Sequence, residues 1–90
     1  MRYFLGQCEY KWSHTAEQGN ERMEQIWIRR ELGEELYREI NEEDYKLVLL
    51  RSNGIVENIY CRCDIYVDID NADKALLFEI KYGKQRIELA

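Results

Sequence analysis

Apolar and polar residues alternate without a break from residue 59 to residue 70. Odd positions such as Ile65 and Val67 are apolar, and even positions such as Tyr66 are polar or amphipathic. Successive side chains of a β-strand point to opposite faces of its sheet, so a period of two over twelve residues is typical of a half-buried strand. The pattern predicts a long strand whose odd-numbered side chains lie in the core.

Residues 2–12 also alternate and predict a strand at the start of the chain. We expect its inner face to carry Phe4, Gly6, Cys8, Tyr10 and Trp12. The next stretch, residues 13–20, is polar and contains a Gly-Asn pair, so it predicts a loop.

Residues 22–29 are the least clear part of the pattern. Ile26, Trp27 and Ile28 form a short apolar run that suits a strand. A helix through this segment would place Gln25 and Arg29 among apolar side chains. We therefore predict a strand.

Residues 31–44 predict a short amphipathic helix, because Leu32, Leu36 and Ile40 recur every four residues and Tyr37 lies beside them. This segment carries seven acidic side chains and one basic side chain. The net charge of the whole chain is −5. The acidic helix therefore accounts for the excess negative charge.

Two further predictions complete the fold. Residues 45–51 are apolar without alternation, which predicts a strand covered on both faces, and Ser52 to Gly54 predict a tight turn after it. Residues 76–82 and 85–89 predict a hairpin around Gly83-Lys84, because that register places Phe78 opposite Leu89.

Together these elements predict an α+β fold, with a curved, mainly antiparallel sheet of five to six strands and one short acidic helix packed on it. Residues 1–90 form a single domain, in which 46% apolar and 34% charged residues allow a packed core and a charged shell. The sequence has no membrane span and no apolar leader, so we expect a cytoplasmic protein.

The three cysteines agree with a reducing compartment, since an odd number leaves no complete disulfide framework. Cys61 and Cys63 point to the same side of the predicted strand, and Cys8 and His14 would complete four zinc ligands. Zinc pairs usually lie in a turn, whereas buried cysteine is common in cores. We therefore expect no metal and no cofactor.

An aspartate on one strand and a Glu-x-Lys sequence on the next form the sharpest catalytic candidate. Asp64, Asp68 and Asp70 lie on the outer face of the long strand, and Glu79 and Lys81 follow on the predicted hairpin. Residues 64–81 thus resemble the metal-binding pattern of restriction-endonuclease-like nucleases. The resemblance implies that two carboxylates hold Mg²⁺ and that the lysine orients water. No basic surface for nucleic acid accompanies the pattern, so we do not expect direct nucleic-acid binding.

We expect instead a small acidic, non-enzymatic interaction protein that binds a basic surface of a partner protein by charge mimicry. Concentrated negative charge speeds association with a cationic surface, and tyrosines are common anchors at interfaces. Phage anti-defence inhibitors, immunity proteins and antitoxins are functional classes that such a layout suits, and nucleic-acid-binding proteins are among the partners that we expect. The expected partner-binding residues are Glu31, Glu34, Glu35, Glu42, Glu43, Asp44, Tyr60, Tyr66 and Asp68. The second alternative is a homodimeric accessory protein whose long strands pair edge to edge.

Overall fold

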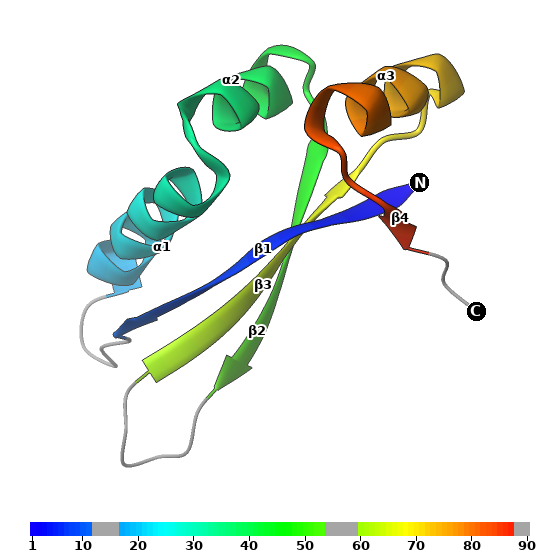
Figure 1. The fold of residues 1–90 in the computed structure, drawn as a ribbon. Helices are drawn as coiled ribbons and strands as arrows, with labels where there is room; N and C mark the ends of the chain where they lie inside the picture. Colours follow the sequence, from blue (N-terminus) through cyan, green and yellow to red (C-terminus); the bar gives the residue numbers. More distant parts are fainter. Residues whose placement is uncertain (12–16, 54–59, 88–90) are drawn as a thin grey trace.

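The computed structural model describes residues 1–11, 17–53 and 60–87. In these ranges the elements follow the order β1 (Arg2–Lys11), α1 (Glu17–Leu32), α2 (Glu34–Glu42), β2 (Lys46–Asn53), β3 (Tyr60–Asp68), α3 (Ala72–Tyr82) and β4 (Arg86–Ile87). The strands form one antiparallel sheet in the order β2-β3-β1-β4 (Figure 1). The fold is therefore α+β, as predicted, but the described part holds four strands and three helices instead of five to six strands and one helix.

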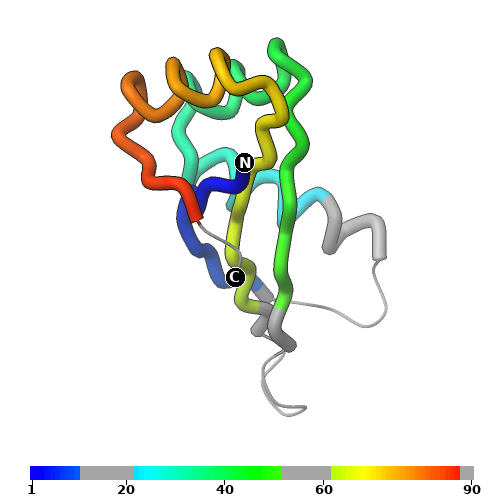
Figure 2. Tube along the Cα trace, turned by 90° about the vertical axis from the view of Figure 1, so that its right-hand side faces the viewer, coloured from blue at the N-terminus to red at the C-terminus, as the bar shows by residue number. Residues whose placement is uncertain are grey.

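The helices lie on one face of the sheet. α1 packs along β1, and α2 and α3 lie beside one another over one end of the strands (Figures 1 and 2). This order, with helical connections on one face, is the split β-α-β arrangement of ferredoxin-like folds. Such a fold supports many functions, so it does not by itself indicate one.

The core lies between the sheet and the helices. The central strand β3 contributes the odd positions that the alternation predicts, and Cys63, Ile65 and Val67 are fully buried. The other buried apolar residues are Tyr3, Leu5, Cys8, Tyr10, Ile28, Leu36, Ile40, Ile69, Ala75 and Phe78. The prediction for the inner face of the long strand is confirmed for these described side chains.

A β-bulge in β1 corrects the predicted inner face of the first strand. Phe4 pairs with Tyr66 and Gly6 pairs with Ile65, so Leu5 is an extra residue on β1. An extra residue reverses the alternation beyond it. Cys8 and Tyr10 point inward as predicted, whereas before the bulge Tyr3 and Leu5 are buried and Phe4 is exposed. Trp12 lies outside the described residues.

Residues 17–32 are helical, so the predicted strand over 22–29 is wrong, and so is the predicted loop for residues 17–20. Gln25 and Arg29 are exposed on α1, and the helix buries Ile28 and the carboxylate Glu24 instead. Polar contacts from the sheet satisfy Glu24, and a local apolar pattern does not reveal them. The acidic helix itself starts later than predicted, because Gly33, with φ 84°, separates α1 from α2.

Residues 72–82 are also helical, so the predicted hairpin over 76–89 is wrong. Asn71 caps α3 by accepting a hydrogen bond from the Lys74 backbone N–H at 3.0 Å. Gly83 ends the helix with a left-handed φ of 63°. It acts as a helix C-cap where the hairpin prediction placed a strand turn. Arg86 and Ile87 then pair with Tyr3 and Arg2 of β1.

β2 lies at an edge of the sheet, which corrects the prediction that both of its faces are covered. Leu47, Val48 and Leu49 are half-buried, and Leu50 is 51% exposed. The strand continues through Asn53, and the rest of the predicted turn, with Gly54, lies outside the described residues. None of the helices in the described part of the chain has the length and apolar character to cross a membrane.

Candidate functional site

The most distinctive surface of the molecule is the pair of helices α2 and α3. Two lysines on α3 reach carboxylates of α2 and of the turn after it: Lys81 Nζ lies 2.8 Å from Glu39 Oε1, and Lys74 Nζ lies 2.7 Å from Glu43 Oε2. Lys81 also lies 3.7 Å from Glu35. These contacts hold two helices that are distant in sequence side by side (Figure 2).

The outer side of α3 exposes three large aliphatic side chains. Leu76, Leu77 and Ile80 are 56%, 66% and 73% exposed, although they belong to an ordered helix. Their spacing of three and four residues places them on one stripe, and the opposite stripe, with Ala75 and Phe78, is buried in the core. α3 therefore carries an exposed apolar stripe on the side opposite the one that it buries in the core.

Of this stripe, Leu77 lines one of two adjoining grooves that α3 shares with the acidic side chains of α2 and of the turn after it. One groove has a volume of about 350 Å³ and is lined by Glu34, Glu35, Arg38, Glu39, Glu42 and Lys81. The other, of about 200 Å³, contains Leu77 together with Glu39, Glu43, Tyr45, Lys74, Phe78 and Lys81. We call the surface made by Glu35, Glu42, Leu76, Leu77 and Ile80 the helical face. It combines an apolar stripe with a negative border.

Internal ion pairs neutralise part of the negative charge. Arg29 of α1 donates to Glu34 through Nε at 2.8 Å, and this hydrogen bond lowers the pKa of Glu34. The hydrogen bond to Glu39 raises the pKa of Lys81, and the hydrogen bond to Glu43 raises that of Lys74. Seven carboxylates of residues 31–44 thus stand against four cations, Arg29, Arg38, Lys74 and Lys81, which leaves a net charge of −3.

The remaining predicted acids are placed less centrally. Glu31 is exposed near the end of α1 and its side chain lies over Gly6 of β1. Glu42 is exposed at the end of α2. Asp44 is exposed in the turn that leads to β2, where it adopts a positive φ of 54°. Of the predicted helix-side residues, Glu35 and Glu42 lie on the helical face, where Glu35 also lies 3.7 Å from Lys81, whereas Glu34 and Glu43 are held by shorter ion pairs.

Tyr66 and Asp68 lie on the other face of the sheet, away from the helices. We call it the open face; its described side chains are Arg2, Phe4, Gln7, Glu9, Lys46, Val48, Leu50, Arg62, Asp64, Tyr66 and Asp68. The rings of Phe4 and Tyr66 meet at 5.4 Å. Asp68 accepts hydrogen bonds from Arg2 at 2.8 and 3.0 Å, and these bonds lower its pKa. The predicted site is therefore divided between two opposite faces. Tyr60 begins β3, but its side chain lies outside the described part.

The residues of the nuclease-like pattern are not brought together. Asp64 and Asp68 lie on the open face, where they bond to Gln7 and Arg2. Glu79 lies on helix α3 and accepts a hydrogen bond from the Tyr3 hydroxyl, at 2.9 Å, on the side of the sheet that the helices cover. Lys81 points to α2 instead. The prediction that Glu79-x-Lys81 lies on a strand beside Asp64 is wrong, because this segment is helical.

Cys8 and Cys63 are opposite one another on β1 and β3, and both are buried. The side chain of Cys61 and the whole of His14 lie outside the described residues. Within the described ranges, no group of three or more histidine, cysteine or acidic side chains is arranged to hold a metal ion.

Leu76, Leu77 and Ile80 are site residues that the sequence pattern did not predict, because the pattern placed them in a strand, whereas they lie on helix α3. Two signals in the sequence indicate the helix: Asn71 before it and Gly83 after it are common helix caps. Ala75, Phe78 and Tyr82 also have helical spacing, and they form its inner stripe.

Comparison with known proteins adds no family to this description. A scan against family models matched none, and searches of curated proteins and of solved structures found no significant similarity.

Proposed function

We propose that this protein is a small, acidic, non-enzymatic binding protein of the inhibitor type, and that it docks its helical face onto a partner protein. The observation that carries the proposal is the exposed stripe of Leu76, Leu77 and Ile80 on α3, in which Leu77 shares a groove with Glu39 and Glu43. A cytoplasmic location belongs to the same proposal, and the odd number of cysteines, three, supports it.

The apolar stripe supplies the affinity in this proposal. Burying an aliphatic side chain stabilises a complex by about 25 cal/mol per Å² of apolar surface removed from water. Ile80 is the most exposed member of the stripe, at 73%, so it has the most surface to gain from a partner. A few well-packed residues near the centre of a protein interface account for most of its binding energy.

The negative border supplies orientation and rate. Glu35 has a side chain that is 77% exposed, and it shares the larger groove with Glu42. A partner with an apolar pocket rimmed by lysine or arginine matches this arrangement in shape and in charge. Basic pockets of this kind occur on nucleic-acid-binding proteins, so an acidic protein that covers one would block access to the nucleic acid. Anti-defence, immunity and antitoxin proteins act in this general way, which is the functional class that we propose.

Affinity capture with matched variants tests the proposal. The wild-type chain is used as bait in a lysate of its native host, beside Ile80→Lys on the helical face and Ile26→Lys on α1. Ile26 is also apolar and exposed, at 50%, so the control makes the same chemical change elsewhere. We expect the wild type and Ile26→Lys to retain one partner that Ile80→Lys loses, with affinity for the purified partner reduced about 30-fold, as for an interface anchor of about 2 kcal/mol.

A second pair of variants tests the charge. Glu35→Lys/Glu42→Lys reverses two carboxylates of the helical face, and Glu9→Lys/Asp70→Lys makes the same change in net charge at exposed sites elsewhere. We expect the first pair to slow association about tenfold at low salt and to weaken its salt dependence, and the second pair to have little effect. The proposal is wrong if Ile80→Lys captures every protein that the wild-type bait captures.

A further inference from the structure

The sheet has two edges that differ in how well they are protected. Beyond Tyr3, β1 has no strand neighbour among the described residues on the side of β4, which pairs with Arg2 and Tyr3 alone. This edge is interrupted by the bulge at Leu5 and by Lys84, whose Nζ donates to the Leu5 carbonyl at 3.4 Å. Its outward side chains beyond the bulge are the polar Gln7 and Glu9. Bulges and charged residues are the usual means by which edge strands avoid pairing with other chains.

The β2 edge has no bulge, and its two charged residues, Lys46 and Arg51, flank an apolar run. Lys46–Asn53 pairs with β3 in an unbroken register over eight residues, and its outer side has no strand neighbour in the described part of the chain. Leu47, Val48, Leu49 and Leu50 form an apolar run in which the side chains are half-buried or exposed. A run that is apolar on both faces is typical of an internal strand, covered on each side and paired at both edges. β2 therefore has the sequence of an internal strand at the position of an edge strand.

We propose that β2 pairs antiparallel with β2 of a second copy, about a two-fold axis at Leu49, to give one continuous eight-stranded sheet. A two-fold axis perpendicular to the sheet keeps the helices of both copies on the same face of the joined sheet. Each residue of β2 must therefore lie opposite a residue of the second copy whose side chain points to the same face. Centring on Leu49 places Val48 opposite Leu50 of the second copy and Leu47 opposite its Arg51. The pairing uses no residue of the helical face.

This register suits the side chains of β2. On the open face, Val48 and Leu50 of each copy join across the edge, beside Phe4 and Tyr66, whose rings are already in contact. The cations Lys46 and Arg51 lie opposite Ser52 and Leu47, so no cation faces another. A centre at Leu50 would instead bring the two Arg51 side chains into diagonal contact, where like charges destabilise a sheet.

The charges of the open face favour a protein partner over a nucleic acid. Among the described side chains of this face, three cations, Arg2, Lys46 and Arg62, stand beside three carboxylates, Glu9, Asp64 and Asp68. Arg2 is bonded to Asp68, and Arg62 donates to Gln7 at 2.8 Å. A face with no net positive charge gives little attraction for phosphates. The exposed Phe4 and Tyr66 therefore suit an extended protein sheet better than a strand of stacked bases.

Sedimentation of the full chain over a range of concentrations tests the pairing. An interface of one strand pair is smaller than the roughly 1,200 Å² of stable complexes, so we expect a reversible dimer with a dissociation constant on the order of micromolar. Leu50→Lys should weaken the dimer at least tenfold, while Ile26→Lys on α1 leaves it unchanged. Leu50 and Ile26 are 51% and 50% exposed, so both variants should fold.

Cysteine crosslinking tests the register. Residues opposite one another in antiparallel strands have Cα atoms about 4.5–5.5 Å apart, which is within reach of a disulfide. Leu49→Cys should therefore give a covalent dimer with oxidised glutathione, whereas the wild type, with its native cysteines, and Ile26→Cys should not. Amides of residues 46–53 should exchange more slowly as protein concentration rises.

Three results would overturn the pairing: a monomer at every concentration, a dimer that Leu50→Lys leaves intact, or no crosslink through Leu49→Cys. The open face would be assigned to nucleic acid instead if the chain sediments as a monomer and binds a labelled oligonucleotide, and if Phe4→Ala abolishes that binding. A variant that loses the dimer but still captures a partner through the helical face would show that the pairing of β2 and the proposed function are independent of one another.

Discussion

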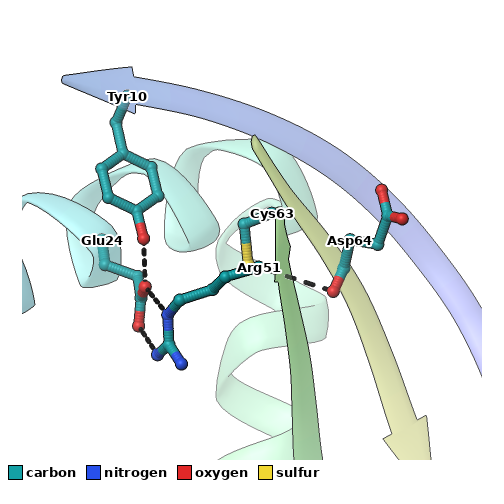
Figure 3. Close-up of polar contacts among 5 residues, drawn as sticks. All are labelled: Tyr10, Glu24, Arg51, Cys63 and Asp64. Atoms are coloured by element: carbon teal, nitrogen blue, oxygen red, sulfur yellow. Dashed lines mark hydrogen bonds and ion pairs between the residues drawn. The ribbon is translucent and has the colours of Figure 1, made fainter. Parts of the chain in front are cut away.

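The two ends of the helical layer are fastened to the sheet by different chemistry. At the α3 end, the ring of Phe78 lies 5.2 Å from that of Tyr3, 5.0 Å from Tyr82 and 6.3 Å from Tyr45. At the α1 end, Glu24 accepts a hydrogen bond from the Tyr10 hydroxyl and one from Arg51 Nε at 2.6 Å (Figure 3). The α3 end is held mainly by aromatic packing, with the hydrogen bond from the Tyr3 hydroxyl to Glu79 beside the rings, and the α1 end is held by the buried carboxylate of Glu24.

The difference concerns how each end responds to conditions. Aromatic packing does not depend on ionisation. At the α1 end, burial raises the pKa of Glu24, but the hydrogen bonds from Arg51 and Tyr10 together with the charge of Arg51 outweigh it, so the pKa lies below its ordinary value of 4.5. A lowered pKa means that this carboxylate stabilises the fold above pH 4.5, and that the stabilisation is lost as the pH falls through the lower folded pKa. Acid should therefore loosen α1 before α3.

The largest effect is expected from Phe78→Ala, which empties the aromatic end. Phe78 is 2% exposed and contacts three other rings. Truncation of a buried phenylalanine costs about 3–5 kcal/mol, a large part of the stability of a domain this small. Urea unfolding should show the loss, and it should be equal at pH 7 and pH 4. Phe78→Leu keeps most of the volume and should cost much less. A loss that grows or shrinks with pH would show that this end is not purely apolar.

The next effect is expected from Glu24→Gln, which removes the charge at the α1 end and leaves the shape. The Glu24 side chain is 9% exposed, whereas that of Arg51 is 43% exposed, so the pair is less costly to break than a fully buried one. We expect a loss of about 2 kcal/mol at pH 7. Because the wild-type carboxylate loses its advantage on protonation, the difference between wild type and variant should shrink below pH 4.5.

Amide exchange locates this effect. At pH 7, Glu24→Gln should speed exchange in α1 and leave that in α3 unchanged. Glu9→Gln is the matched control, since Glu9 is exposed on β1. Faster exchange in both helices would contradict the view that the two ends are held independently.

The strands that the sequence predicts well are those whose partners are regular. The alternation of β3 gives its buried face because β3 lies between β1 and β2 and one whole face meets the helices. The same reasoning fails in β1, because a single extra residue at Leu5 reverses the phase and nothing in the local pattern marks it. It fails again in β2, where the apolar run predicts cover that a single copy of the chain does not provide.

The helices were harder to predict because their buried faces are unusual. α1 buries a carboxylate, Glu24, whose partners Tyr10 and Arg51 are distant in sequence. α3 is apolar on two stripes, so its pattern lacks the amphipathic period that separates a helix from a strand. For the same reason, only part of the candidate site could be predicted. The acids of α2 are evident from composition, whereas the stripe of Leu77 and Ile80 becomes a surface only when α3 is helical.

The smallest effect is expected from Asn71→Ala, and it tests whether the α3 end depends on polar contacts as well. The Asn71 side chain accepts the Lys74 backbone N–H at 3.0 Å and is exposed to water. Loss of such a cap costs about 1 kcal/mol, and Asn71→Ser should restore most of it, since serine is also a good cap. Urea unfolding should therefore rank the variants as Phe78→Ala, Glu24→Gln and Asn71→Ala. A cap loss equal to that of Glu24→Gln would mean that α3 depends on its first turn as much as on its rings, and the contrast between the two ends would then disappear.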